Sequence, residues 1–75
     1  MSIFSLRIKE QRIEKNLSQQ KMADLLQVVQ ATISTWELGK REPDFETLKR
    51  ICLLFDVSAD YMIGLENEDG TKNKR

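Results

Sequence analysis

Two short helical patterns separated by only a few residues occupy the middle of this chain, between Ser18 and Gly39. The apolar positions that mark the buried face of the first pattern are Met22, Ala23, Leu25 and Leu26. The second pattern has a stripe of Val29, Ile33 and Trp36, and an opposite side of Ala31, Thr35 and Leu38. Because the break is too short for a flexible linker, the two helices must cross at a steep angle. The second helix therefore has a small, uncharged, hydrogen-bonding side that suits close insertion into a partner.

Length and composition limit what can stabilise such a fold. The chain has 75 residues, which allows one domain near the lower size for a single core. Cys52 is the one cysteine, so no internal disulfide forms, and the absence of histidine excludes a Cys/His zinc site. No apolar run reaches the roughly 18 residues of a membrane span, and no signal peptide is visible. We therefore expect a cytoplasmic protein with a purely apolar core, no metal and no cofactor, in which Cys52 is a small buried residue.

The charge distribution gives only a weak functional signal. The formal net charge is zero, with 12 basic and 12 acidic residues, but residues 1 to 41 hold seven basic and four acidic ones. This bias is compatible with contacts to phosphate, and a mixed solvated surface explains it equally well.

Capping residues place three further helices around the central pair. We expect one from Phe4 to Lys15, with Phe4, Ile8 and Ile13 inward and Asn16 as its stop. Ser18 should cap the next helix, and the helix from Gln30 to Leu38 should end at Gly39. Asp44 should cap a helix that ends at Asp56 and buries Leu48, Ile51, Cys52 and Phe55. Ser58 should cap a short last helix with Met62 and Ile63 inward, before a polar tail from Glu66 to Arg75 that we expect to be disordered.

The turn between the two central helices has unfavourable residues. A turn this tight often needs positive φ, and Gln27 in that conformation costs roughly 1 to 2 kcal/mol more than glycine. Val29 stands at the expected N-cap without a side-chain oxygen, which loses about 1 kcal/mol relative to serine or threonine.

Three segments carry a resemblance to a known family: LSQQKMADLL, VQATISTWELGKREPD and LKRICLLFDVSADYMIG. They resemble the helix-turn-helix domain of the phage repressor and Cro family, the XRE-type bacterial regulators, over roughly Phe4 to Gly64. The resemblance implies a compact, all-α, five-helix lambda-repressor-like domain over residues 1 to 65, with helices two and three as the helix-turn-helix. Three residues depart from the family pattern: Gln27 replaces glycine, Val29 replaces serine or threonine, and Gln11 replaces an apolar residue.

The resemblance also implies roles for individual residues. Helix three would be the recognition helix, with base contacts from Gln30, Ala31, Thr32 and Thr35. Contacts to backbone phosphate would come from Gln19, Ser34, Lys40 and Arg41. An ordinary solvated helix face and ordinary surface charge are the alternative interpretations of these two sets. Arg12 and Glu37 would form a structural salt bridge that holds helix three against helix one.

These roles lead us to expect a sequence-specific regulator of transcription, most simply a repressor that binds a palindromic operator in double-stranded DNA as a homodimer. Candidates for the dimer contact are Leu38, Ala59, Tyr61 and Met62, which could equally pack within one protomer. The alternative is an antitoxin or protein-interaction module that binds a partner through its tail and DNA for autoregulation. We expect no enzyme, because the chain lacks histidine, a nucleophile with an adjacent base and a glycine-rich phosphate loop. It would be a small regulator or the DNA-binding part of a longer one, encoded by a bacterium or phage.

Overall fold

Five α-helices make up the computed structural model, which describes residues 2 to 72. They are α1 (Ile3–Glu14), α2 (Gln19–Leu26), α3 (Gln30–Glu37), α4 (Phe45–Phe55) and α5 (Ala59–Ile63). Within this range the remaining regular structure is one antiparallel bridge between Glu66 and Lys72. The predicted all-α, five-helix fold is confirmed. No helix in the described range is long and apolar enough to cross a membrane.

The helix starts follow the capping residues of the sequence. Ser18, Asp44 and Ser58 each accept a hydrogen bond from the backbone N–H three residues later, which confirms the predicted starts of α2, α4 and α5. Ser2 does the same for α1. This fourth cap explains why α1 begins at Ile3, one residue before the predicted start.

The turns between helices use the left-handed backbone conformation. Asn16, Gln27 and Asp56 have φ of 59°, 59° and 57°, so the positive φ predicted at Gln27 is confirmed. Val29 is the N-cap of α3 and makes no side-chain capping bond, also as predicted. The chain leaves α3 through Gly39, whose φ is 77°. Two of the non-glycine residues are asparagine and aspartate, which tolerate this conformation better than glutamine does.

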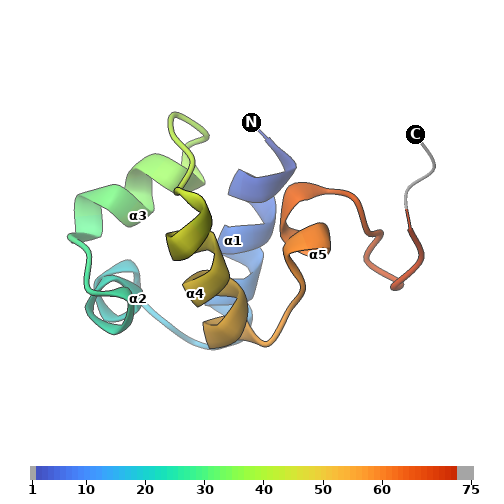
Figure 1. Ribbon diagram of the computed structural model, residues 1–75. Helices are drawn as coiled ribbons and strands as arrows, with labels where there is room; N and C mark the ends of the chain where they lie inside the picture. Colours follow the sequence, from blue (N-terminus) through green and yellow to red (C-terminus); the bar gives the residue numbers. More distant parts are fainter. Residues whose placement is uncertain (1, 73–75) are drawn as a thin grey trace.

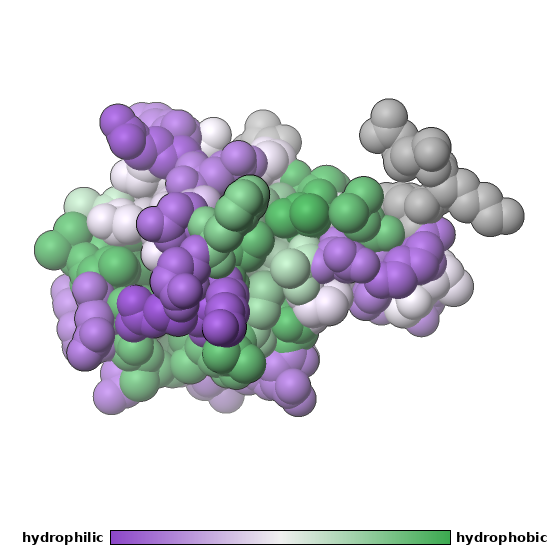
Figure 2. Space-filling view, viewed as in Figure 1, coloured by the Kyte–Doolittle hydropathy of each residue, from purple (hydrophilic) through white to green (hydrophobic). Residues whose placement is uncertain are grey.

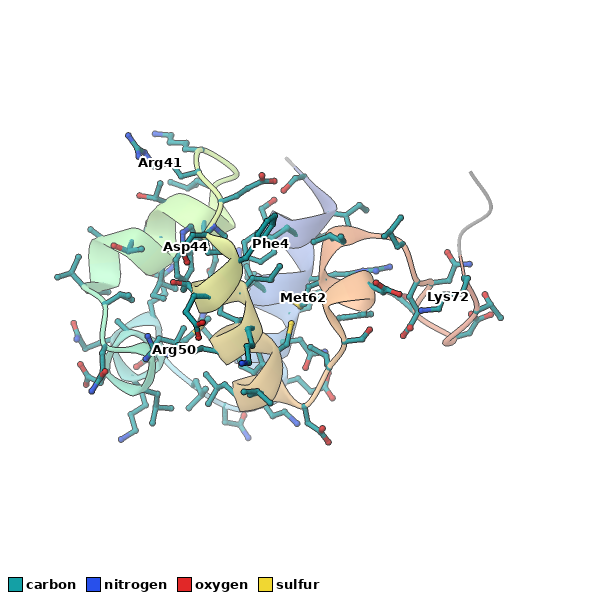
Figure 3. The ribbon with its side chains drawn as sticks, viewed as in Figure 1. Phe4, Arg41, Asp44, Arg50, Met62 and Lys72 are labelled. Carbon is teal, nitrogen blue, oxygen red and sulfur yellow. The ribbon has the colours of Figure 1, made fainter. Side chains whose placement is uncertain are left out.

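The core is a single cluster enclosed by the five helices. Helix α1 contacts α3 on one side and α5 on the other, while α4 packs on α2 and α5 (Figure 1). The buried apolar residues come from all five helices; among them are Phe4 from α1 and Met62 from α5, near the centre of the molecule (Figure 3). They are Phe4, Ile8, Met22, Ala23, Leu26, Ile33, Trp36, Ile51, Cys52, Phe55 and Met62. This matches most of the inward positions predicted for α2, α3 and α4, with Leu48 half-buried against the core.

Four apolar residues predicted to be buried are instead exposed: Ile13, Leu25, Val29 and Ile63. Val29 is the N-cap of α3, so it lies outside the helix on whose buried stripe it was predicted. With about 100° of rotation per residue, Ile13 lies well away from the α1 stripe that includes Ile8. Leu25 similarly lies at the edge of the buried face of α2. In α5, a helix of five residues, burying Met62 turns its neighbour Ile63 outward.

The polar segment after α5 folds back on the domain. The Lys72 ammonium lies 2.6 Å from an Asp60 carboxylate oxygen and 3.2 Å from one of Glu66. The buried Arg7 guanidinium donates to the carbonyls of Tyr61 and Glu66 and stacks 4.4 Å from the centre of the Tyr61 ring. We expected a disordered tail from residue 66 onward; these bonds instead hold residues 66 to 72 in a defined turn, and residues 73 to 75 lie outside the described range.

Candidate nucleic-acid interface

Helices α2 and α3 pack against each other with one face of α3 open to solvent. In α3 the side chains of Ile33, Trp36 and Glu37 are buried toward the core. The outer side begins with the exposed Gln30 and continues through residues 31 to 35, which are exposed or half-buried apart from Ile33. Figure 1 shows α3 at the edge of the molecule with α2 beside it. This arrangement presents the amino-terminal half of α3 to a partner.

A chain of hydrogen bonds connects the exposed start of α3 to its buried end. The Gln30 Nε2 donates to Gln19 Oε1 over 2.5 Å, and the Gln19 Nε2 donates to Glu37 Oε1 over 3.1 Å. Arg12 closes the chain with a bidentate salt bridge to the carboxylate of Glu37, at 2.6 Å and 3.1 Å. The Glu37 side chain is 5% exposed and that of Arg12 is 14% exposed. One carboxylate thus joins α1, α2 and α3.

Two arginine side chains donate hydrogen bonds to main-chain carbonyls near the two ends of α2. Besides its salt bridge, Arg12 donates to the carbonyl of Leu17, between α1 and α2. Arg50 reaches from α4 toward α2 and donates to the carbonyl of Leu26 over 2.7 Å (Figure 3). Since the last carbonyls of a helix lack partners within it, this bond satisfies the end of α2. Together the two arginines fix the position of α2 relative to α1 and α4.

One hydroxyl on the outer face of α3 is engaged within the helix. The Thr35 hydroxyl donates to the carbonyl of Ala31 over 2.8 Å, so its hydrogen is already used within the helix. A shallow depression of about 160 Å³ lies beside it, lined by Ala31, Thr32, Thr35, Trp36 and Arg41. Thr35 therefore presents its methyl group together with the methyl group of Ala31.

The cationic residues near α3 lie in the loop that follows it. Lys40 and Arg41 are exposed, and Arg41 projects away from the body of the domain beside the end of α3 (Figure 3). Ser34 is half-buried. Gln19 is the first residue of α2. Its NH₂ group donates one hydrogen to Glu37 and its oxygen accepts from Gln30, so the second amide hydrogen is not used in this hydrogen-bond chain. These groups surround the outer face of α3.

A separate apolar groove lies where the amino terminus of α1 approaches α4 and α5. Its volume is about 300 Å³, and its apolar lining includes Ile3, Phe45, Leu48 and Ile63. The Phe45 side chain is 87% exposed. Figure 2 shows apolar side chains gathered at this surface. The sequence does not predict this groove, because helical spacing places Ile63 in the core and indicates no role for Ile3 or Phe45.

The four predicted dimer-contact residues do not form one surface. Leu38 and Ala59 are exposed, and Tyr61 is half-buried with its ring against Arg7. Met62 is fully buried in the core of the protomer, so its side chain is unavailable to a partner.

Burial also raises the pKa of the Cys52 thiol, in keeping with its position in the core.

Comparison with known proteins agrees with this geometry. The Helix-turn-helix family profile (HTH_3) matches residues 8–62. The HTH-type transcriptional regulator YqaE of Bacillus subtilis is 42% identical over 67 residues, covering 89% of this chain and 58% of that protein. The HTH-type transcriptional activator BcrR of Enterococcus faecalis is 38% identical over 63 residues, covering 84% of this chain and 31% of that protein.

A solved structure shows the same arrangement of helices. A transcriptional regulator from Listeria innocua superposes with a TM-score of 0.78 at 29% identity, covering 87% of this chain and 61% of that one. The present chain spans a little over half the length of curated relatives such as YqaE. The family match, the shared fold and the exposed second helix of the pair identify this chain as a member of the helix-turn-helix family of DNA-binding transcriptional regulators.

Proposed function

We propose that this chain represses transcription by binding a palindromic operator as a homodimer, with α3 of each protomer in the major groove. The observation that carries the proposal is the start of α3. There Gln30 is exposed, yet it is held by Gln19, and the cationic loop of Lys40 and Arg41 follows the other end of the same helix. A side chain that is both exposed and oriented is suited to reading base edges. The protein would act in the cytoplasm, on the nucleoid.

Base readout in this proposal is concentrated in the first half of α3. The Gln30 carboxamide can accept from N6 and donate to N7 of adenine. The methyl groups of Ala31, Thr32 and Thr35 would meet the methyl group of thymine. Because the Thr35 hydroxyl donates to Ala31, toward a base it would offer its methyl group and an accepting oxygen, not a donor.

Positioning on the DNA backbone would come from groups around α3. Lys40 and Arg41 would contact phosphates on one side of the groove, with Ser34 as a further hydroxyl donor. The Gln19 amide lies at the amino terminus of α2, where unpaired backbone N–H groups and the helix dipole favour an anion. These contacts would fix orientation without reading sequence.

The apolar groove supplies a surface for the dimer. A second copy of this chain could place its own Phe45 against Ile3 and Ile63, and the two-fold symmetry would repeat the contact. Burying each exposed phenylalanine would contribute roughly 1.5 to 3 kcal/mol. The dimer would hold two recognition helices about 34 to 36 Å apart, one turn of DNA. Leu38 and Ala59, which are exposed, remain candidates for the edge of this contact, whereas the buried Met62 is excluded.

Selection of binding sites from a random duplex library, repeated at several salt concentrations, tests the DNA-binding part. We expect roughly palindromic sites and a negative slope of log affinity against log salt concentration. Gln30→Ala should relax preference at one position per half-site, whereas Lys40→Ala should weaken all sequences alike and reduce the slope by about 1. The absence of both selected sites and salt dependence would reject the proposal in favour of a protein-interaction module.

The dimer has its own test. Phe45→Ser should lower the self-association measured by analytical ultracentrifugation and the cooperativity of binding to the two half-sites. The matched control is Leu53→Ser, because Leu53 is exposed on the same helix but does not line the groove. Equal association of both variants and the parent protein would exclude this surface.

Repression needs a separate measurement, because the relative BcrR is named an activator. Transcription in vitro from a promoter that overlaps the selected site should fall as the protein is added. An increase in transcript would show activation instead.

A further inference from the structure

The buried carboxylate of Glu37 lies at the inner end of the hydrogen-bond chain that reaches the exposed Gln30. We propose that Glu37 is a positioning residue for base recognition. Acting through Gln19, it fixes the orientation in which the Gln30 carboxamide presents its oxygen and its NH₂ group to the DNA. The inference rests on the proposed base-reading role of Gln30. It adds a determinant of specificity that does not touch the DNA.

The direction of the chain follows from the chemistry of its inner end. An ionised carboxylate can only accept hydrogen bonds. Both oxygens of Glu37 accept from Arg12 in a bidentate pair, so the carboxylate acts here as an acceptor. The Gln19 group that lies 3.1 Å from Glu37 Oε1 must therefore be its NH₂ group. Glu37 thus decides the orientation of the Gln19 amide.

The orientation then passes to the next amide. With its NH₂ group directed at Glu37, Gln19 presents its oxygen to Gln30. The Gln30 group that lies 2.5 Å from this oxygen must be a donor, so Gln30 also points its NH₂ group inward. A half-turn of the Gln30 amide would set two acceptor oxygens against each other. The outer edge of Gln30 therefore offers its oxygen and one remaining N–H in a fixed order.

This fixed order matches adenine and disfavours guanine. In the major groove adenine presents one acceptor, N7, and one donor, the N6 amino group. Guanine presents two acceptors, N7 and O6, one of which would meet the Gln30 oxygen. An amide that was free to turn would lose much of this discrimination. The preference for adenine therefore depends on the acceptor-only character of Glu37.

The decisive substitution is Glu37→Gln, which keeps the size of the side chain but can donate as well as accept. A donor at this position allows the Gln19 amide to turn, and then Gln30 can accept inward and direct its NH₂ group outward. We expect the adenine-over-guanine affinity ratio at the Gln30 position to fall about tenfold, within the range of a lost bidentate contact. The ratio is measured with four duplexes that differ only at that base pair.

A matched control separates orientation from stability. Arg12→Lys also removes the bidentate geometry of the buried salt bridge, but it keeps a cation beside Glu37 and so leaves an acceptor-only residue facing Gln19. It should weaken binding to all four duplexes and retain the preference for adenine. Circular dichroism on each variant gives the folded fraction by which affinities are normalised.

A second variant keeps the inference testable if Glu37→Gln does not fold. Gln19→Leu interrupts the chain while the Arg12–Glu37 pair stays intact, and it should lower the same ratio. In the Gln19→Leu background, adding Glu37→Gln should change the ratio no further.

The outcomes distinguish this inference from the function on which it rests. A folded Glu37→Gln or Gln19→Leu variant that keeps the parent ratio, while Gln30→Ala loses it, would overturn the positioning role and leave base readout by Gln30 standing. If Gln30→Ala itself changes no base preference, the proposed readout fails first.

Discussion

Replacing Gln27 by glycine should stabilise the domain. Gln27 has φ 59° and ψ 43°, a conformation that costs a non-glycine residue about 1 to 2 kcal/mol. Removing this strain stabilises the folded state. Glycine also has more conformational entropy than glutamine in the unfolded chain, which offsets about 0.4 to 1 kcal/mol of the stabilisation. The Gln27 side chain is exposed, so its removal uncovers little apolar surface. The net gain should be about 0.5 to 1 kcal/mol.

A gain of this size is measurable as a melting temperature. For a domain of 60 to 100 residues, each kcal/mol shifts the midpoint by about 4 to 8 °C, so we expect a rise of about 2 to 8 °C. The assay is thermal unfolding followed by circular dichroism at 222 nm, with urea unfolding as an independent measure of the free energy.

The comparison that isolates backbone strain is Asn16→Gly. Asn16 has the same φ of 59°, but asparagine adopts the left-handed region more readily than glutamine does. Its substitution should therefore gain less than Gln27→Gly. A Gln27→Gly melting temperature equal to or below that of the parent, or a larger gain at Asn16, would refute the assignment of strain to this turn.

Two further predictions concern single interactions. Removing either partner of the Arg12–Glu37 pair should cost about 3 to 5 kcal/mol because it leaves a buried charge unpaired; a double-mutant cycle from urea unfolding that shows no coupling would reject the pair. Hydrogen bonds from Thr47, first from its backbone and then from its side chain, lower the pKa of Asp44 from 3.8. Its contribution to stability should therefore be complete above about pH 4 and disappear as the pH falls through the lowered value. Asp44→Asn, which keeps a capping oxygen, should lose less melting temperature than the parent on acidification from about pH 5 to 2; parallel pH profiles would contradict the assignment.

The predictions that depend on local sequence signals were the most reliable. The caps at Ser18, Asp44 and Ser58 and the positive φ at Gln27 each depend on a few adjacent residues, so they could be predicted without knowing how the helices pack. The same is true of the bare N-cap at Val29. Periodicity was less reliable. It correctly placed Ile33 and Trp36 in the core but failed for Ile13 and Ile63.

The errors and omissions share a physical cause, which is that tertiary packing decides them. Ile63 is exposed because a five-residue helix buries Met62 instead, and nothing in the spacing of the two residues distinguishes them. The bond between Gln19 and Gln30 joins residues 11 positions apart on two helices, so it depends on their crossing angle. Gln11 is buried with its amide directed at the Tyr61 hydroxyl, 3.5 Å away on a different helix. The sequence alone showed only that a polar residue stood in an apolar position.

The turn held by Lys72 has a practical consequence for experiments on DNA binding. Lys72 and Arg41 project from opposite ends of the molecule, whose longest dimension is 35 Å (Figure 3). A fluorophore or surface tether attached through Lys72 would therefore stand clear of α3. A bulky one would disturb the ion pairs with Asp60 and Glu66 before it obstructed a duplex. Immobilisation through this end should consequently leave the outer face of α3 open to duplexes in solution.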